Sequence, residues 1–500
     1  MDAPCAAVKR RAFGAVLIPA LWLVASAHVG SPDVVYDGSA GAYAVRVIVR
    51  PPNVVPGLAD VVVRVNASDA RRVTIQPVFW KTGVSGAPIG DEARRVAGEA
   101  NLYSGQVWLM SRGAYSVYVN VEGARGSGTA VVPVNSIATA RLGMSPFLGG
   151  ILVVLGGVLI AGLITIVRAA AGEGVLPPGQ VADASVRRRA NRFALIATPL
   201  FAVLVFGGAK WWNTVDAAYR RTMFRPPAVD VALSANGLLQ LNVHDTASYR
   251  ALFAPVVPDH GKMMHLFIVS EPDHLVFAHL HPVQGDSLHF STTLPPLPAG
   301  HYRLFGDLTI ETGASFTVTN TFDVGSSASN GAPADSDDAW LESRTLAPAN
   351  RGAIARLGGG STLTWLTNGP IVARRPLDLA FEVKDSAGRV AALQPFLGMA
   401  AHAVVLASDD SVFIHLHPMG TVTAAAQQIF QARDRGDTTA RGRLRADAVI
   451  SPAMDMSYSG SLSFPYEFPK AGRYRMWVQV KRQNRILTGA FDIDVRGSSN

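Results

Sequence analysis

Cysteine is almost absent from this chain of 500 residues, since Cys5 is its single cysteine. One thiol near the N-terminus cannot form a disulfide within the chain, and it excludes metal sites built on several thiolates. The fold must therefore be stabilised by hydrophobic cores. Any chemistry with a soft metal ion must use histidine and methionine.

Motifs of common enzyme chemistry are also missing. The chain contains neither a Gly-x-Ser-x-Gly nucleophile elbow nor a His-Glu-x-x-His zinc motif. The glycine run 358–360 is not followed by the Lys-Ser/Thr pair that a phosphate-binding loop requires. We therefore expect that the protein is not an enzyme.

Acidic residues are fewer than basic ones, 37 against 45, which gives a net charge of +8. Five of these charges come from two short segments, +2 from residues 2–11 and +3 from residues 168–192. Basic residues beside apolar runs mark the cytoplasmic ends of membrane segments. The charge is thus a topology signal, and we expect no nucleic-acid partner.

Long apolar runs occur at three places. Residues 1–27 combine a basic start, an apolar run and a small-residue end, which is typical of a signal peptide. Residues 147–167 carry no charge and match the roughly 20 residues that a transmembrane helix needs. Residues 193–212 end on two tryptophans suited to a membrane interface, and they predict a second transmembrane helix.

The connector between the two predicted spans, residues 168–192, is rich in arginine and is expected to be a cytoplasmic loop. This predicts a multi-pass protein of a bacterial cytoplasmic (inner) membrane, with the lipid bilayer as a partner. Its large domains would face the periplasmic or extracellular side. The alternative is that both runs are buried core helices of a soluble protein.

The region 28–140 alternates apolar and polar residues in short runs, such as Tyr43–Val49 and Asp60–Val65. This pattern predicts a small antiparallel β-sandwich. The runs Gly105–Leu109 and Gly113–Val119 are expected to be paired late strands.

A Gly-aromatic strand is followed by the short proline-containing run Val131–Val134. With this pattern, the region of roughly residues 40–135 resembles the FixH/YtkA-like family of extracytoplasmic bacterial domains. Residues 28–33 would open the mature chain, the two spans follow, and residues 259–266 come after them. In this order of segments the chain is similar to a group of uncharacterised bacterial integral-membrane proteins. The resemblance implies architecture and location but no activity. The expected fold is mainly β, with three extracytoplasmic Ig/cupredoxin-like β-sandwich domains plus two transmembrane helices.

Residues 226–324 and 340–496 are expected to be diverged copies of one domain, separated by a flexible linker at 325–339. Each copy contains a histidine, then a His-Leu-His-Pro sequence, then a Gly-x-Tyr-Arg sequence, in the same order. Residues 421–448 are expected to be an insertion in the second copy, part helix and part loop.

The histidines of each copy are expected to converge on one spot. Folding the run 401–417 about its Ser408–Ser411 turn places His402 opposite His417, and His415 shares a strand face with His417. In the first copy, His265 falls near His279 and His281. The sequence thus predicts two separate three-histidine sites.

Copper is the expected metal, because imidazole binds it well and methionine, including Met419, is close in sequence. His260 is expected near the first triad and Met454 and Met456 near the second. Asp307 is a candidate hydrogen-bond partner for the first triad, although Gln479 stands at the corresponding place in the second copy.

Two other interpretations remain open at this point. In the second interpretation, the histidines form internal hydrogen-bond networks of a non-catalytic component that binds envelope protein partners. A third interpretation is a metalloenzyme with an open coordination position, for which no general base is identifiable.

Overall fold

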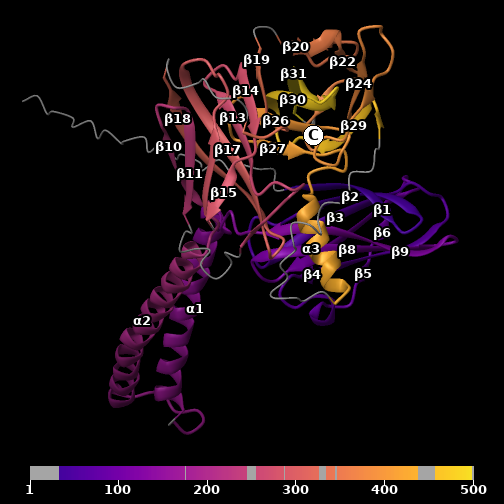
Figure 1. Cartoon of the computed structure of the whole chain (residues 1–500). Helices are drawn as coiled ribbons and strands as arrows, with labels where there is room; N and C mark the ends of the chain where they lie inside the picture. The colour runs from indigo at the N-terminus through magenta and orange to yellow at the C-terminus, as the bar shows by residue number, and fades with distance from the viewer. Residues whose placement is uncertain are drawn as a thin grey trace, which may run out of the picture.

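The computed structural model describes residues 33–174, 176–244, 255–286, 288–325, 334–343, 346–436 and 457–497. Strands dominate these residues, and two long helices extend away from the body that the sheets form (Figure 1). The expectation of a mainly β protein with two long apolar helices is confirmed. The signal peptide expected at 1–27 lies outside the described residues.

The first region contains two sheets that share one hydrophobic core. Their strand orders are β1-β2-β3-β7-β6 and β5-β4-β8-β9. Alternate valines of the second and third strands are fully buried because successive side chains of a strand point to opposite faces. The elements are β1 (Val34–Ala40), β2 (Tyr43–Arg50), β3 (Gly57–Val65), β4 (Ala70–Phe79), η1 (Val84–Gly86), β5 (Asp91–Glu92), β6 (Arg94–Arg95), β7 (Leu102–Leu109), β8 (Gly113–Gly123) and β9 (Gly126–Ser136).

The expected pairing of the two late strands is wrong. The runs 105–109 and 113–119 lie in β7 and β8, but β7 pairs with β3 and β6, whereas β8 pairs with β4 and β9. The short connection between them crosses from one sheet to the other. Alternation of apolar residues defines strands without defining their partners. The proline-containing run Val131–Val134 lies in β9, as a strand.

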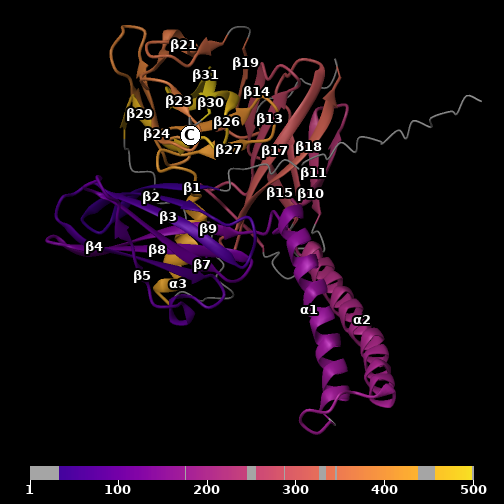
Figure 2. The ribbon, with the colours of Figure 1, turned by 180° about the vertical axis from the view of Figure 1, so that it is seen from behind.

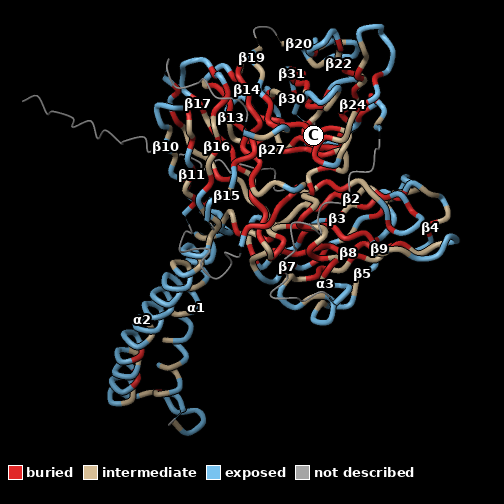
Figure 3. Tube along the Cα trace, in the orientation of Figure 1, coloured by how far each residue is buried: buried red, intermediate tan, exposed pale blue. Residues whose placement is uncertain are grey.

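Two helices, α1 (Pro146–Glu173) and α2 (Ala184–Arg221), are long and apolar enough to cross a membrane. At 1.5 Å per residue they are about 42 and 57 Å long, more than the roughly 30 Å of a hydrocarbon core. Their surfaces are almost entirely exposed, in contrast to the buried strands (Figure 3).

The predicted spans 147–167 and 193–212 lie inside these helices, but the expected loop 168–192 is mostly helical. Only residues 174–183 separate the helices, because the Asp183 side chain caps α2 by accepting from Val186 N, well before the apolar run begins. The arginines of the expected loop therefore extend the helices beyond their apolar parts.

The first repeat begins directly after α2 and contains two sheets. Their strand orders are β10-β11-β16-β15 and β12-β17-β13-β14-β19, with β18 paired to β17. The elements are β10 (Ala228–Leu233), β11 (Leu238–His244), β12 (Val256–Val257), β13 (His265–Ser270), β14 (Val276–Leu280), β15 (Val283–Asp286), β16 (His289–Thr293), β17 (Gly300–Ile310), β18 (Ser315–Val324) and β19 (Ala339–Glu342).

The last of these strands corrects the predicted domain boundary. The linker was expected at 325–339 and the second repeat from 340, yet β19 pairs with β14 of the first repeat. Hydrogen bonds with the Asp335 and Asp338 side chains also fix the chain just before β19. The acidic, alanine-containing composition resembles a linker, but its carboxylates find partners in the folded protein.

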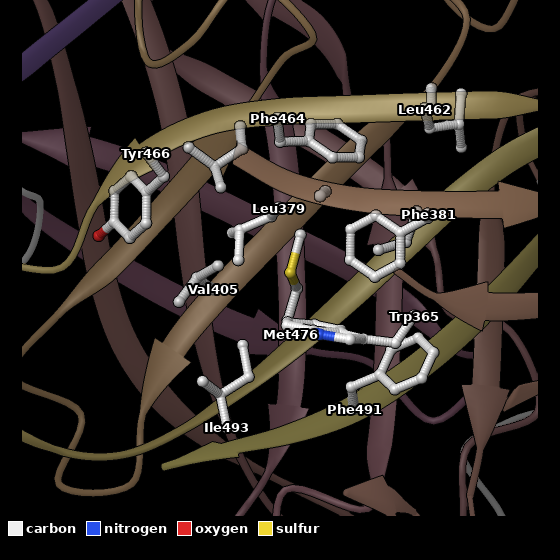
Figure 4. Close-up of a cluster of buried hydrophobic side chains, with 14 of the residues drawn as sticks. Trp365, Leu379, Phe381, Val405, Leu462, Phe464, Tyr466, Met476, Phe491 and Ile493 are labelled. Atoms are coloured by element: carbon white, nitrogen blue, oxygen red, sulfur yellow. The ribbon is translucent and has the colours of Figure 1, made fainter. Parts of the chain in front are cut away.

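The second repeat has the sheet orders β20-β31-β30-β26-β27, with β23 paired to β31, and β21-β22-β24-β29. Large apolar side chains, among them Trp365, Phe381, Met476 and Phe491, fill the space between its sheets (Figure 4). The elements are β20 (Ala347–Pro348), β21 (Ile354–Arg356), η2 (Gly358–Gly360), β22 (Thr362–Trp365), β23 (Ile371–Val372), β24 (Pro376–Lys384), β25 (Ala392–Leu393), β26 (His402–Ala407), β27 (Phe413–Leu416), α3 (Ala424–Asp434), β28 (Tyr458–Ser459), β29 (Ser461–Glu467), β30 (Gly472–Arg482) and β31 (Arg485–Arg496).

The geometry of the two repeats matches at the landmarks that predicted a duplication. The strand order β17-β13-β14 corresponds to β30-β26-β27. In each copy the tyrosine hydroxyl donates to the backbone carbonyl four residues upstream, Tyr302 to Pro298 at 2.7 Å and Tyr474 to Lys470 at 2.8 Å. These matching features support the predicted duplication.

The two repeats face each other through equivalent aromatic residues. Phe277 of β14 stacks on Trp477 of β30 with ring centroids 4.7 Å apart, and Phe413 of β27 stacks on Phe305 of β17 at 4.2 Å. Because Phe277 corresponds to Phe413 and Phe305 to Trp477, the two contacts are the same contact made in both directions. The repeats therefore pack as a pseudo-symmetric pair within one chain.

The second repeat is also joined to the first region. Helix α3 packs against β9, and its Phe430 shares a small core with Val78, Tyr118 and Val131. Both views place α3 alongside the sheets of this region (Figures 1 and 2). The helix lies within the expected insertion 421–448, whose residues from 437 onward lie outside the described residues.

A turn directly after His417 makes a backbone contact between these regions. Gly420 forms a bridge with Tyr36 of β1, and Asp37 N donates to Met419 O at 2.8 Å. A Cβ at Gly420 would lie 2.1 Å from Val35 O, and the glycine has a φ of +110°. Only glycine allows this close approach.

We predict that Gly420→Ala loosens the contact between the turn and β1. Local strain of this kind costs about 1–3 kcal/mol, so amide hydrogen exchange at Val35 and Asp37 should accelerate about tenfold or more. Gly388→Ala is the matched control, since Gly388 also has a positive φ but nothing lies within 4 Å of its Cβ position. Equal exchange in the two variants would contradict the prediction.

Candidate metal centre

The hairpin registers bring the predicted histidines together within each repeat. In the second repeat Ala403 pairs with Leu416, which continues the ladder to His402 opposite His417, as expected. In the first repeat Leu266 pairs with Leu280, so His265 lies opposite His281. The predicted register is thus confirmed for the second repeat. The hairpin of the first repeat has the equivalent register.

The two sites, however, are not separate. The ring centroid of His415 lies 5.2 Å from that of His265 and 5.8 Å from that of His279, both in the first repeat. It lies 5.4 Å from that of His402 in its own repeat. The strands that carry the histidines belong to the two faces that pack against each other. The sequence indicated the hairpins but contained no signal that their histidine-bearing faces would meet.

A seventh histidine completes this histidine cluster, which consists of His260, His265, His279, His281, His402, His415 and His417. His260 was expected near the first triad, and its ring lies 6.3 Å from that of His265. It lies closer to the second repeat, with ring centroids 5.4 Å from His402 and 5.0 Å from His417. It occupies a tight turn between Asp259 and Lys262 with a φ of 51°. The Asp-His-Gly-Lys sequence signals such a turn but does not indicate which repeat it faces.

Two groups of three histidines have nitrogens close enough to share an ion. The first-repeat group contains His265, His279 and His281, and the mixed group contains His260, His402 and His417. Within each group the ligand atoms all lie within 4.8 Å of one another. His415, expected as a ligand of the second triad, lies between the two groups.

Outer hydrogen bonds orient several of these rings. Nδ1–H of His281 donates to Asp338 Oδ1 at 3.0 Å. Nδ1–H of His279 donates to Gln479 Oε1 at 2.8 Å. Nδ1–H of His417 donates to the Val422 carbonyl at 3.2 Å. Each bond leaves Nε2 of the ring with a free lone pair. Metal-binding histidines are held in the same way.

His265 and His279 present a conflict that a metal ion would resolve. His265 Nε2–H donates to the Asp259 carbonyl at 3.2 Å, so its Nδ1 carries a lone pair. That Nδ1 lies 3.2 Å from His279 Nε2, which carries a lone pair as well. Nitrogens of a tetrahedral site with bonds of about 2.0–2.1 Å lie about 3.3–3.4 Å apart. The observed spacing therefore fits two ligands of one ion.

Several other imidazole nitrogens are buried without a partner. Among the described residues no hydrogen bond reaches Nε2 of His260, His281, His415 and His417, nor either nitrogen of His402. An unsatisfied buried polar group costs about 1–3 kcal/mol. Unpartnered nitrogens concentrated at one place indicate a site built for a ligand.

Burial favours the neutral form of five rings of the cluster. Burial lowers the pKa of His415 to about 3. Burial lowers the pKa of four other histidines well below 6.5, and neighbouring histidines lower these four pKa values further; the four are His265, His279, His402 and His417. For His415 the nearby Asp259 carboxylate opposes the effect of burial. Neutral imidazole is the form that binds metal ions.

Asp307, the candidate partner of the first triad, and Gln479, at the corresponding place in the second copy, each contact a histidine of the opposite repeat. Asp307 pairs in register with His265, but its carboxylate lies 3.6 Å from Nδ1 of His415 in the second repeat. Gln479 pairs in register with His402, but binds His279 of the first repeat. Burial raises the pKa of Asp307 to about 7, opposed by the Thr317 hydroxyl that donates to it.

Methionine contributes less than the sequence suggested. Met419 was expected as a ligand, yet its side chain packs against the hydrophobic core of the first region. The reason is the turn around Gly420, which directs residue 419 toward β1. Met454 and Met456 lie outside the described residues.

A family model described as a domain of unknown function (DUF8832) matches residues 228–326 and 356–497. These stretches cover most of the two repeats and contain all seven histidines of the cluster. No curated protein matches the chain.

Several solved structures are similar to parts of the chain. An engineered protein is 17% identical over 18% of this chain and 19% of its own length, with a TM-score of 0.15. A tetra-tandem repeat from the extending region of a large adhesion protein is 8% identical over 89% of this chain and 71% of its own, with a TM-score of 0.17. The BSP domain of a biofilm associated protein is 8% identical over 95% and 68%, with a TM-score of 0.14. Scores this low support no argument about the fold or the function.

A cleft of about 190 Å³ leads to the cluster from the junction of the three β-rich regions. Its lining includes His265, His415, His417 and Asp307, together with residues of the first region. The cluster is therefore buried but has one side from which an ion can approach.

We predict that the metal-free protein loses stability as the pH falls below about 6.5. The unfolded chain then binds protons that the buried histidines of the folded state do not, which costs up to about 1.4 kcal/mol per pH unit for each such histidine. The loss continues toward pH 3, where His415 begins to titrate in the folded protein.

His415→Leu should make this decline shallower, whereas His289→Ala, at an exposed position, should not change it. Thermal unfolding of the metal-free chain between pH 4 and 8 measures both slopes, and a flat profile for the unsubstituted protein would contradict the prediction.

Proposed function

We propose that this protein is a membrane-anchored, extracytoplasmic protein that captures or buffers copper at the histidine cluster. The observation that carries the proposal is the distance of 3.2 Å between His265 Nδ1 and His279 Nε2 in a buried site, where the other nitrogen of each ring is hydrogen-bonded elsewhere. A proton between them would create a buried charge, and burial opposes this. A metal ion satisfies both nitrogens.

The donor set favours copper over most other ions. The grouped ligands are neutral imidazoles, which suit copper, zinc and nickel better than magnesium or calcium. Among divalent ions of the first transition row, Cu²⁺ binds a given nitrogen site most tightly. Because no cysteine occurs among the residues that the structure describes, a thiolate site for Cu(I) is not part of the proposal.

The location is part of the same proposal. Two helices that can cross a membrane, with arginines between their apolar parts, fit a multi-pass protein of a bacterial inner membrane. The three β-rich regions would then be Ig/cupredoxin-like sandwiches on the periplasmic or extracellular side, the first of them FixH/YtkA-like. We propose no catalytic activity.

A second candidate function is a structural component of an envelope complex. It is favoured by the hydrogen bonds from His281 to Asp338 and from His279 to Gln479, which also occur in purely structural networks. In that case the cluster would stabilise the contact between repeats, and other envelope proteins would be the partners.

We predict that the purified full chain in detergent retains copper after loading with Cu²⁺ and desalting, as measured by mass spectrometry. A variant with His279, His281, His415 and His417 all changed to alanine should lose this copper, because both groups lose ligands. The matched control replaces the exposed histidines His244, His289 and His301 with alanine and should retain it.

Absence of copper from the unsubstituted protein would contradict the proposal. If His417→Ala then also lowers the unfolding temperature, the structural candidate gains support. Loading with Zn²⁺ in parallel tests the choice of metal, and a site that retains zinc but not copper would contradict it.

The proposed topology predicts which surfaces a membrane-impermeant maleimide reaches. In a Cys5→Ser background, Asn236→Cys on the first repeat should be labelled in intact bacterial cells. Gln180→Cys, between the two helices, should be labelled only after the membrane is permeabilised. Labelling of both positions in intact cells would contradict the assigned orientation.

A further inference from the structure

We infer that the histidine cluster is a two-metal centre, with one ion in the first-repeat group and a second in the mixed group. This inference rests on the proposed metal-binding function and adds the number of ions, their division between the repeats and their dependence on each other. Neither repeat contains all the residues of the centre.

The free nitrogens divide into two sets that share no residue. His265 Nδ1, His279 Nε2 and His281 Nε2 are available in the first-repeat group. Nε2 of His260 and His417 and a nitrogen of His402 are available in the mixed group. Three imidazoles leave one position of a tetrahedral ion open, so each set is sufficient for an ion of its own.

Pseudo-symmetry also favours two ions. The stacked pair of Phe277 and Trp477 corresponds to that of Phe413 and Phe305, so the interface contains each local environment twice. The contact of His279 with Gln479 likewise corresponds to that of His415 with Asp307. The residues equivalent to the first-repeat group are His402, His415 and His417, and two of them, His402 and His417, belong to the mixed group.

The two positions are linked by a short chain of contacts. Nε2–H of His265 in the first-repeat group donates to the Asp259 carbonyl, and the next residue, His260, is a ligand of the mixed group. The same turn ends at Lys262, which forms an ion pair with Asp335 at 2.5 Å. Asp335 N in turn donates to Asp338, the residue that holds His281. An ion that fixes His265 and His281 therefore also fixes the turn that presents His260.

His415 occupies the space between the groups. Its Nε2 has no partner among the described residues, and its ring lies 4.5 Å from that of His417 and 5.2 Å from that of His265. It belongs to neither group of closely spaced nitrogens, although it lies next to both. It lines the cleft together with His265 and His417.

The test is a titration of the full chain in detergent with Cu²⁺ alone, followed by desalting and metal analysis. We expect two copper ions per chain, one in His281→Ala, one in His417→Ala and none in the double variant. His301→Ala, at an exposed position, should bind two. Because the groups are linked, each single variant should also bind its remaining ion at least tenfold more weakly.

Electron paramagnetic resonance of the unsubstituted protein provides a measurement that does not depend on how the variants fold. Two adjacent Cu²⁺ ions should give dipolar broadening and a half-field transition. Loading with one equivalent each of Cu²⁺ and Zn²⁺ should weaken the interaction, because chains that hold one ion of each kind contain an isolated Cu²⁺.

The possible failures are distinguishable. One copper ion per chain, lost in either single variant, would overturn the two-metal centre and leave the proposed function intact. Two ions without magnetic interaction would overturn their adjacency. Absence of copper from the unsubstituted protein would overturn both the centre and the proposed function.

Discussion

Burial of imidazoles without enough hydrogen-bond partners is the constraint to which the rest of this structure responds. Free nitrogens on five histidines lie inside the protein unpaired among the described residues, at a cost of about 1–3 kcal/mol for each such group. The adjoining aromatic core offsets this cost, since Phe267 stacks on His279 with centroids 4.3 Å apart and connects the cluster to the stacked pairs between the repeats. Apolar packing thus holds in place a polar group of residues that would not assemble alone.

The regions outside the two hairpins complete the enclosure. Asp259 accepts from Ala425 N at the start of α3, so the turn that carries His260 and the helix inserted in the second repeat fix each other. The first region pairs through β1 with the turn that follows His417. Movement of either the helix or the first region would therefore change the positions of ligand-bearing turns.

Exchange of supporting residues between the repeats distinguishes this arrangement from two independent domains. Gln479 holds a ring of the first repeat, and Asp307 approaches a ring of the second. One supporting residue is a neutral amide and the other a carboxylate, so the two halves differ in charge although their backbones match. The pseudo-symmetric pair is consequently asymmetric at the place where its chemistry would occur.

Local patterns in the sequence were sufficient for the strands, the two long helices and the hairpin register that places His402 opposite His417. These features depend on side-chain alternation, turn residues and apolar length, which are properties of neighbouring residues. Pairing between distant strands is not such a property, which is why the partners of β7 and β8 and the attachment of β19 were predicted wrongly.

The same distinction applies to the candidate site. Its six histidines in the two hairpins could be named from spacing alone, because each hairpin aligns its own residues. Only the tertiary structure merged the two triads, moved His260 to the mixed group and directed Met419 into another core. These outcomes depend on which faces of the two folded repeats pack against each other. The packing is decided by the complementary shapes of four aromatic side chains, Phe277, Trp477, Phe305 and Phe413, and these shapes meet only after the strands have formed.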